Sequence, residues 1–222
     1  MKAMILAAGR GERMRPLTDS LPKPLLAAGG KPLIVHHIEK LKRAGISELV
    51  INHAWLGHKL VAALGDGSAF GVSIRWSAEE SALETAGGIV QALPLLGSDP
   101  FLVINGDTWI DADYATLVSQ PLGSDLAHLW LVPNPPQHPD GDFSLQAGRV
   151  QDAPALTFSG IGLYHPAAFA YLPSGAHKLA PLLRDWMAQG RVGGSLLAGE
   201  WRDIGTVERL RALDEQLLAG TH

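Results

Sequence analysis

A loop close to the start of the chain combines small residues with cations, a combination suited to binding phosphate. Gly9 and Gly11 follow a short apolar run, Arg13 comes two residues later, and Lys23 stands between two prolines. Small residues let a ligand approach backbone N–H groups, and successive N–H groups form an anion-binding concavity. Arg13 can hold phosphate oxygens in a fork, and the prolines stiffen the backbone around Lys23, which adds a point charge. The loop therefore predicts a site for a nucleoside triphosphate.

The same loop departs from two common phosphate-binding patterns. No third glycine follows Gly11 at the spacing of the dinucleotide fingerprint, and the loop has no Gly-Lys-Ser/Thr triplet of the Walker type. The alternative interpretation is an ordinary turn between a strand and a helix. The arginines, the segment Pro16–Thr18 and the lysine between prolines favour the phosphate site over that alternative.

Two aspartates are candidates for holding a metal ion. Asp107 follows the expected strand 101–104, and ligands bind at the carboxyl ends of strands in open α/β sheets. Asp203 lies far along the chain, just before Ile204 and Gly205. Taken alone, Asp107 is also typical of a turn and Asp203 of a helix start. Together with a triphosphate, two carboxylates are suited to Mg²⁺, a hard cation that prefers oxygen ligands.

Two further positions are candidates for ligand contact. The segment 81–88 joins an expected strand to an expected helix, and its small residues and free N–H groups suit an approach to the base of a nucleotide. A tightly packed helix cap is the alternative for this segment. His53 follows a strand end and is a candidate contact to the ligand. The nine histidines show no zinc-binding spacing, and no Gly-x-Ser-x-Gly nucleophile motif occurs.

Alternating strand-like and helix-like runs are expected to position these residues. Such alternation predicts an α/β fold with a mostly parallel, twisted sheet covered by helices on both faces. After Pro133, a loop rich in turn formers and several short apolar runs indicate a smaller antiparallel lobe. The expected strands are 3–8, 49–52, 72–76, 101–104, 127–132, 143–145 and 156–164, and the expected helices are 31–44, 56–64, 86–93 with its end at Pro94, 114–119, 179–189, and 207–218 with Thr206 as N-cap.

Composition excludes several classes of protein. The chain has 222 residues, of which 46% are hydrophobic, so it can form a substantial core. A net charge of −4 argues against a nucleic-acid partner, and the absence of cysteine excludes disulfides and cysteine-ligated zinc. No apolar run approaches the roughly 20 residues of a membrane span, and the N-terminus does not have the pattern of a signal peptide. We therefore expect a cytoplasmic protein with no nucleic-acid or membrane partner.

Six segments together resemble, in order, the motifs of the sugar-1-phosphate nucleotidyltransferases. The resemblance implies a Rossmann-like α/β/α sandwich with a mixed, mostly parallel sheet and a small antiparallel lobe over the sugar. We expect a single catalytic domain, 1–222, with a nucleotide half at about 1–110 and a sugar-binding half at about 111–222, and a monomer or weak homodimer. The matching segments are Leu6–Thr18, Pro22–Leu25, Thr85–Gly87, Asn105–Asp107, Gly160–Tyr164 and Trp201–Thr206.

The resemblance also implies a role for individual residues. Arg13 and Lys23 are expected to be catalytic, acting on the reacting phosphates, and Asp107 and Asp203 are expected to bind Mg²⁺. The expected nucleotide contacts are Ala7, Ala8, Gly9, Gly11, Glu12, Arg13, Lys23, Thr85, Ala86 and Gly87, and the expected sugar contacts are Asn105, Gly160 and His53.

Two departures from the usual family pattern bear on the identity of the sugar. Glu84 stands where the family often has glycine, and residues 158–160 replace the usual Asn-Ala-Gly. A compact member with Leu-Glu-Thr at 83–85 resembles the N-acetylmuramate α-1-phosphate uridylyltransferases of peptidoglycan recycling. The substrates implied are UTP and a sugar 1-phosphate that carries a lactyl carboxylate. A pocket for that carboxylate should provide an extra donor, for which Arg149, Arg202 and Ser159 are candidates.

The implied reaction transfers a nucleotidyl group to the sugar 1-phosphate and releases pyrophosphate. A sugar phosphate, with a second pKa of roughly 6, is already ionised at neutral pH, so the reaction needs no general base. Catalysis should then consist of alignment and charge neutralisation. The motifs leave open a guanylyltransferase for mannose or heptose 1-phosphate. A non-catalytic nucleotide-sensing subunit of the same fold is a further alternative. The presence of Arg13 and Lys23 together with the two aspartates argues against it.

Overall fold

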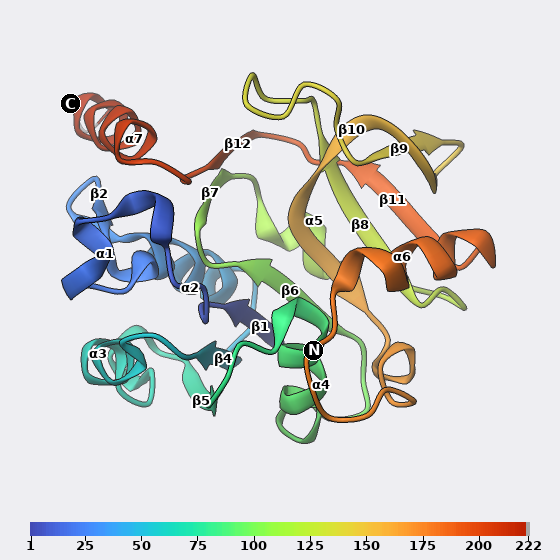
Figure 1. Cartoon of the computed structure of the whole chain (residues 1–222), viewed down its shortest axis with the longest axis horizontal. Coiled ribbons are helices and arrows are strands. Elements are labelled where there is room, and N and C mark those ends of the chain that lie inside the picture. Colours follow the sequence, from blue (N-terminus) through green and yellow to red (C-terminus); the bar gives the residue numbers. More distant parts are fainter. Residues whose placement is uncertain (221–222) are drawn as a thin grey trace.

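The computed structural model describes residues 1–220. At the centre of the fold is a mixed sheet of eight strands (Figure 1). Its strands are β1 (Ala3–Leu6), β4 (Glu48–His53), β5 (Ser73–Ala78), β6 (Phe101–Asn105), β8 (Ala127–Val132), β9 (Phe143–Gln146), β10 (Arg149–Tyr164) and β11 (Val192–Leu196). The strand order is β11-β8-β10-β6-β1-β4-β5, with β9 paired to β10. The strands β6, β1, β4 and β5 are parallel, whereas β10 runs antiparallel to both β6 and β8. The sheet is therefore parallel from β6 to β5 and mixed on the other side of β6.

Helices cover both faces of this sheet. In a strand, successive side chains point to opposite faces, so Ile5 and Met4 of β1 enter different cores. Ile5 shares its core with α2 (Leu33–Arg43) and α3 (Gly57–Leu64), and Met4 shares its core with α4 (Glu84–Leu96) and α6 (Leu179–Ala188). The short helix α5 (Tyr114–Val118) lies on the face of α2. This arrangement confirms the predicted Rossmann-like α/β/α sandwich.

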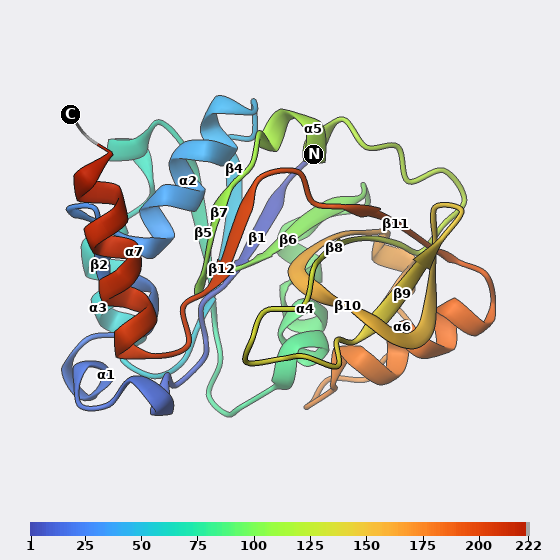
Figure 2. The same cartoon turned by 90° about the horizontal axis from the view of Figure 1, so that it is seen from above.

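The end of the described chain returns to the N-terminal half. The helix α7 (Val207–Ala219) packs beside β2 (Ala27–Ala28), as Figure 2 shows. The strand β2 pairs with β3 (Lys31–Pro32). The strand β12 (Glu200–Asp203), directly before α7, pairs with β7 (Thr108–Asp111). Thr206 is the N-cap of α7, as predicted, and its hydroxyl accepts a hydrogen bond from the Arg209 backbone N–H. The remaining short helical segments are η1 (Glu12–Met14), α1 (Leu17–Ser20), η2 (Lys23–Leu25), η3 (Ser68–Phe70) and η4 (Pro166–Ala168).

The predicted helix end at Pro94 is wrong, because α4 continues to Leu96. A proline in a helix removes one backbone hydrogen bond. Pro94 lies exposed in the last turn, where only one such bond is lost, and the buried Leu96 anchors that turn in the core. The helix ends instead at Gly97, in a backbone conformation that favours glycine.

Other boundaries differ in ways that matter for the site. The predicted helix 31–44 begins only at Leu33, and β10 starts at Arg149 rather than at Leu156. The strands β7, β11 and β12 were not expected from the sequence. Across residues 1–220, no helix is both long and apolar enough to cross a membrane. A single sheet joins the two predicted halves of the chain through the pairing of β6 with β10. The assignment of nucleotide binding to one half and of sugar binding to the other stays a prediction. Residues 221 and 222, the end of the predicted domain, lie outside the described part.

Candidate active site

A cleft of about 890 Å³ opens at the carboxyl ends of β1, β4 and β6. This is the edge where ligands bind in open α/β sheets. The structure brings most of the predicted nucleotide and phosphate residues together in its wall. The predicted site residues that line the cleft are Ala7, Ala8, Gly9, Gly11, Glu12, Arg13, Lys23, Thr85, Asn105 and Asp107.

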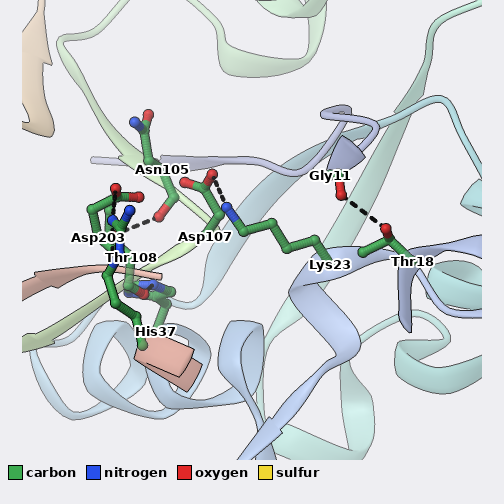
Figure 3. Close-up of polar contacts among 9 residues, drawn as sticks. Gly11, Thr18, Lys23, His37, Asn105, Asp107, Thr108 and Asp203 are labelled. Atoms are coloured by element: carbon green, nitrogen blue, oxygen red, sulfur yellow. Dashed lines mark hydrogen bonds and ion pairs between the residues drawn. The ribbon is translucent and has the colours of Figure 1, made fainter. Parts of the chain in front are cut away.

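The loop after β1 is shaped around Gly11. This residue has a φ of 68°, and a Cβ atom there would lie 2.9 Å from Cγ2 of Thr18. The Thr18 hydroxyl donates a hydrogen bond of 2.8 Å to the Gly11 carbonyl, as Figure 3 shows. Glycine is therefore required for the turn that brings Arg13 to the cleft. Arg13 is exposed and forms no ion pair with a carboxylate of residues 1–220, so its guanidinium is available to an anion.

A short chain of hydrogen bonds fixes the start of the same loop. The Ala7 backbone N–H donates to Oδ1 of Asn52 at 2.8 Å, and Nδ2 of Asn52 donates to Oε1 of Glu79 at 2.7 Å. The Ala7 amide is thus engaged within the protein. Burial raises the pKa of the Glu79 carboxyl, and the hydrogen bond from Asn52 opposes that shift. Asn52 and Glu79 both line the cleft, and sequence reasoning missed both.

Lys23 and Asp107 form an ion pair at the centre of the cleft. The distance from Nζ of Lys23 to Oδ2 of Asp107 is 2.7 Å. The Lys23 side chain is 7% exposed, whereas that of Asp107 is 41% exposed, so the pair presents its carboxylate to the cleft. Asp107 follows β6 through Gly106, where a Cβ would lie 2.8 Å from the Leu6 carbonyl oxygen. The close approach of two strand ends thus explains the glycine before the aspartate.

Asp203 reaches the same region from the C-terminal part of the chain. In the pairing of β12 with β7, Asp203 lies opposite Thr108, and the Ile204 N–H donates to the Asp107 carbonyl at 3.2 Å. The two aspartates therefore come from neighbouring backbone positions (Figure 3). The Arg209 guanidinium forms a short ion pair with the Asp203 carboxylate.

The donor set of the two aspartates fits Mg²⁺ as a partner. Both side chains offer hard carboxylate oxygens, which Mg²⁺ prefers, and this ion is usually held by one or two carboxylates together with substrate phosphates and water. Residues 1–220 contain no cluster of three or more His, Cys, Asp or Glu side chains suited to a metal. The arrangement thus suits an ion that obtains its other ligands from a bound phosphate.

A buried histidine supports the strand next to Asp107. Nε2 of His37 lies 2.8 Å from the Thr108 carbonyl, and Nδ1 lies 2.8 Å from the Tyr114 hydroxyl. Because a carbonyl only accepts hydrogen bonds, Nε2 carries the proton and Nδ1 accepts from Tyr114. Burial lowers the pKa of His37 to about 4, which keeps the ring neutral near pH 7. His37 is thus a core residue, with 2% of its surface exposed.

A second cavity of about 460 Å³ continues from the first, with which it shares Leu6, Glu84, Thr85 and Asn105. Gly160 lies in its wall at a bulge of β10, with a φ of 80°. A Cβ on Gly160 would lie 2.5 Å from Nδ2 of Asn105, so two of the three predicted sugar contacts meet directly.

Other predicted contacts lie outside both cavities. Free N–H groups at the start of α4 were expected, but the Ala86 and Gly87 amides donate to the His177 carbonyl at 2.9 and 3.2 Å. The expectation is wrong for these two amides, because the loop that carries His177 takes up their hydrogen bonds. The His53 ring lies against Gly57, the first residue of α3, and packs edge-on against Trp76 of β5. It lines neither cavity.

The three candidates for an extra donor to the sugar are also engaged elsewhere. Arg149 forms an ion pair with Asp125, and Arg202 forms one with Glu200. The Ser159 hydroxyl is buried and donates to the Trp130 carbonyl. None of the three lines the second cavity, whereas Lys178, which sequence reasoning missed, does.

Comparisons with known proteins agree with this geometry. The model of the nucleotidyl transferase family matches residues 2–138. The chain is 56% identical over 230 aligned positions to an N-acetylmuramate α-1-phosphate uridylyltransferase of Neisseria meningitidis, covering 99% of each chain. It is 34% identical to one of Caulobacter vibrioides, covering 97% of this chain and 96% of the other. A crystal structure named for a glucose-1-phosphate thymidylyltransferase of Bacillus anthracis, in complex with sucrose, superposes with a TM-score of 0.87 at 26% identity, covering 98% of this chain and 95% of that one.

Proposed function

The chain belongs to the nucleotidyl transferase family, and we propose that it makes UDP-N-acetylmuramic acid and pyrophosphate from UTP and N-acetylmuramate α-1-phosphate. Two relatives that match it over nearly their whole length bear the name of this activity. The enzyme is accordingly a sugar-1-phosphate uridylyltransferase, and its place is in the recycling of peptidoglycan.

The observation that carries the proposal is the continuity of two cavities of different character. The first contains the phosphate-binding loop, Lys23 and Asp107, and the second contains apolar side chains with a few polar groups, a lining suited to a sugar with acyl substituents. Asn105 and Thr85 belong to both walls. A nucleotide in the first cavity and a sugar phosphate in the second would therefore meet at this junction.

The transfer forms one bond and breaks one. A phosphate oxygen of the sugar 1-phosphate attacks the α-phosphorus of UTP, and the bond from that phosphorus to the oxygen bridging the α- and β-phosphates breaks, so that pyrophosphate leaves. The attacking oxygen is already ionised, so alignment and charge neutralisation account for the catalysis. Lys23 neutralises charge at the reacting phosphates and Arg13 holds the leaving pyrophosphate, while backbone around Gly11 wraps the triphosphate.

Asp107 and Asp203 are the residues that would hold Mg²⁺. The ion would supply positive charge that offsets the negative charge on the triphosphate. Lys23 fixes the orientation of the Asp107 carboxylate, and Arg209 does the same for Asp203. We further propose that the enzyme works in the cytoplasm, as a monomer or weak homodimer, without nucleic-acid or membrane partners.

A screen of substrates tests the proposal. Pyrophosphate release is measured with each of UTP, GTP, dTTP, CTP and ATP against the 1-phosphates of N-acetylmuramate, N-acetylglucosamine, glucose and mannose, with and without Mg²⁺. The expected result is the highest kcat/KM for UTP with N-acetylmuramate 1-phosphate. A higher kcat/KM for GTP with mannose 1-phosphate would assign the chain to the guanylyltransferases, and no release with any pair would favour a non-catalytic role.

A further inference from the structure

The cavity that continues from the nucleotide cleft has an apolar floor and a charged rim. Val103, Phe143, Phe158 and Leu183 supply apolar side chains, which suit the methyl groups of acyl and lactyl substituents. The charged side chains in its wall are Glu84, Asp142, Lys178 and Arg184.

Two of these four charges are already satisfied within the protein. Asp142 accepts a hydrogen bond from the Phe158 N–H at 2.8 Å and lies 3.0 Å from Nε2 of His138. Arg184 forms an ion pair with Asp152 at 2.9 Å. Lys178 forms no ion pair with any carboxylate of residues 1–220, so it is the cation in this wall whose charge is not neutralised.

The backbone beside Lys178 is fixed to the segment that joins the two cavities. The His177 N–H donates to the Leu83 carbonyl at 3.0 Å, and the His177 carbonyl accepts from the Ala86 and Gly87 amides. Lys178 is the next residue, directly before α6. The segment it is tied to carries Glu84 and Thr85, which line both cavities. These hydrogen bonds therefore hold the backbone next to Lys178 in place relative to the junction where the sugar phosphate would lie.

We propose that Lys178 binds the lactyl carboxylate of the sugar substrate and selects an anionic N-acetylhexosamine 1-phosphate over its neutral-sugar counterpart. The inference rests on the proposed function, because it assigns a residue to a group of that substrate. A compact ammonium on a flexible stem suits a carboxylate that is attached to the sugar through a rotatable ether. The carboxylate of Glu84, in the same wall, would oppose a second anion in the cavity, so a cation is needed to admit the lactyl group.

The contact between Lys178 and the lactyl carboxylate is tested by removing the charge from the protein and, separately, from the substrate. Lys178→Met keeps the length of the side chain and removes its charge, and Lys178→Arg keeps the charge. N-acetylglucosamine 1-phosphate lacks the lactyl ether but is otherwise the same sugar. The matched control is Lys42→Met, which removes the same charge from an exposed position on α2 outside both cavities.

The measured quantity is the ratio of kcat/KM for the two sugar phosphates, with UTP saturating and the melting temperature recorded for each variant. In Lys178→Met, we expect the preference for the lactyl sugar to fall by about tenfold or more, mainly through KM, since a hydrogen bond to a charged group is worth that factor. Lys178→Arg should recover part of the preference, and Lys42→Met should keep all of it.

An equal loss for both sugars in Lys178→Met would overturn the assignment, since Lys178 would then act on the shared phosphate or on the fold. An unchanged ratio would overturn it as well. Both results leave the proposed function standing if the wild-type enzyme still uses UTP and N-acetylmuramate 1-phosphate. If the wild-type enzyme does not turn over that pair, the proposed function fails together with the role of Lys178.

Discussion

Lys23 lies almost fully buried behind Asp107, with its Nζ atom 2.7 Å from the aspartate Oδ2. In the proposed reaction the lysine would serve the cleft in two ways: its charge would add to the field at the phosphates, and its ion pair holds the carboxylate that would bind the metal. Lys23 is the first residue of the short segment η2 and is flanked by Pro22 and Pro24, which restrict its backbone.

Replacing Lys23 with methionine should abolish most turnover while the protein stays folded. Removing one charge-stabilising group from a reacting centre costs on the order of 10²–10³ in rate. Asp107 remains 41% exposed and can be hydrated, so the melting temperature should change little. The checks are kcat from pyrophosphate release and circular dichroism. A folded variant with nearly normal kcat would contradict the catalytic assignment.

Neutralising either aspartate should raise the Mg²⁺ concentration needed for activity. Asp107→Asn and Asp203→Asn each remove one anionic oxygen from a site that has two carboxylates. Asp107→Asn should also lower stability, because it leaves the buried Lys23 without its counter-ion. Activity is titrated with MgCl₂ after EDTA treatment. Full activity of the wild type in EDTA would show that the metal assignment is wrong.

We expect position 160 to tolerate no residue other than glycine. Gly160→Ala places a Cβ against the Asn105 amide and forces a left-handed φ on alanine, which costs roughly 1–2 kcal/mol. Because both residues line the second cavity, KM for the sugar phosphate should rise more than KM for UTP. Gly190→Ala, also at a left-handed φ but with open space around it, is the matched control and should lower stability without changing either KM.

Much of this architecture could be predicted from the sequence because its signals are local. The buried strands β1 and β6 appear as continuous apolar runs, and Thr206 begins α7 because its side chain can cap the first turn. The loop from Gly9 to Lys23 could be identified as a candidate phosphate site for the same reason, since its glycines and cations lie close together in the sequence, and the structure places it in the wall of the cleft.

The rest depends on contacts between distant parts of the chain. Nothing near Asp203 indicates that β12 pairs with β7, or that this pairing brings the residue beside Asp107. Lys178 acquires its position from hydrogen bonds of His177 to the start of α4. Asn52 could have been found, because it ends a predicted strand at the edge where ligands bind.

Glu84 has a left-handed backbone, with a φ of 59°, at the junction of the two cavities. Such a conformation costs a non-glycine residue roughly 1–2 kcal/mol. Glu84→Gly should therefore raise the free energy of unfolding by about 1 kcal/mol, as measured in urea. If stability falls instead, the carboxylate makes contacts that outweigh the backbone strain. Glu84→Ala, which keeps the strain and removes the carboxylate, separates the two effects.

Stability should decrease as the pH falls from about 6.5 toward 4, in part because of His37. Burial lowers the pKa of this residue to about 4 in the folded protein, whereas the unfolded chain titrates near 6.5. Between these values the unfolded state binds more protons, so acid favours unfolding by up to about 3 kcal/mol. Above the unfolded pKa both states are neutral and this stability is fully present. His37→Gln removes the titration and keeps an amide able to donate to the Thr108 carbonyl. Urea unfolding at pH 7.5 and pH 5.0 should therefore show a smaller difference for the variant than for the wild type. An equal difference in both proteins would mean that other groups account for the acid sensitivity.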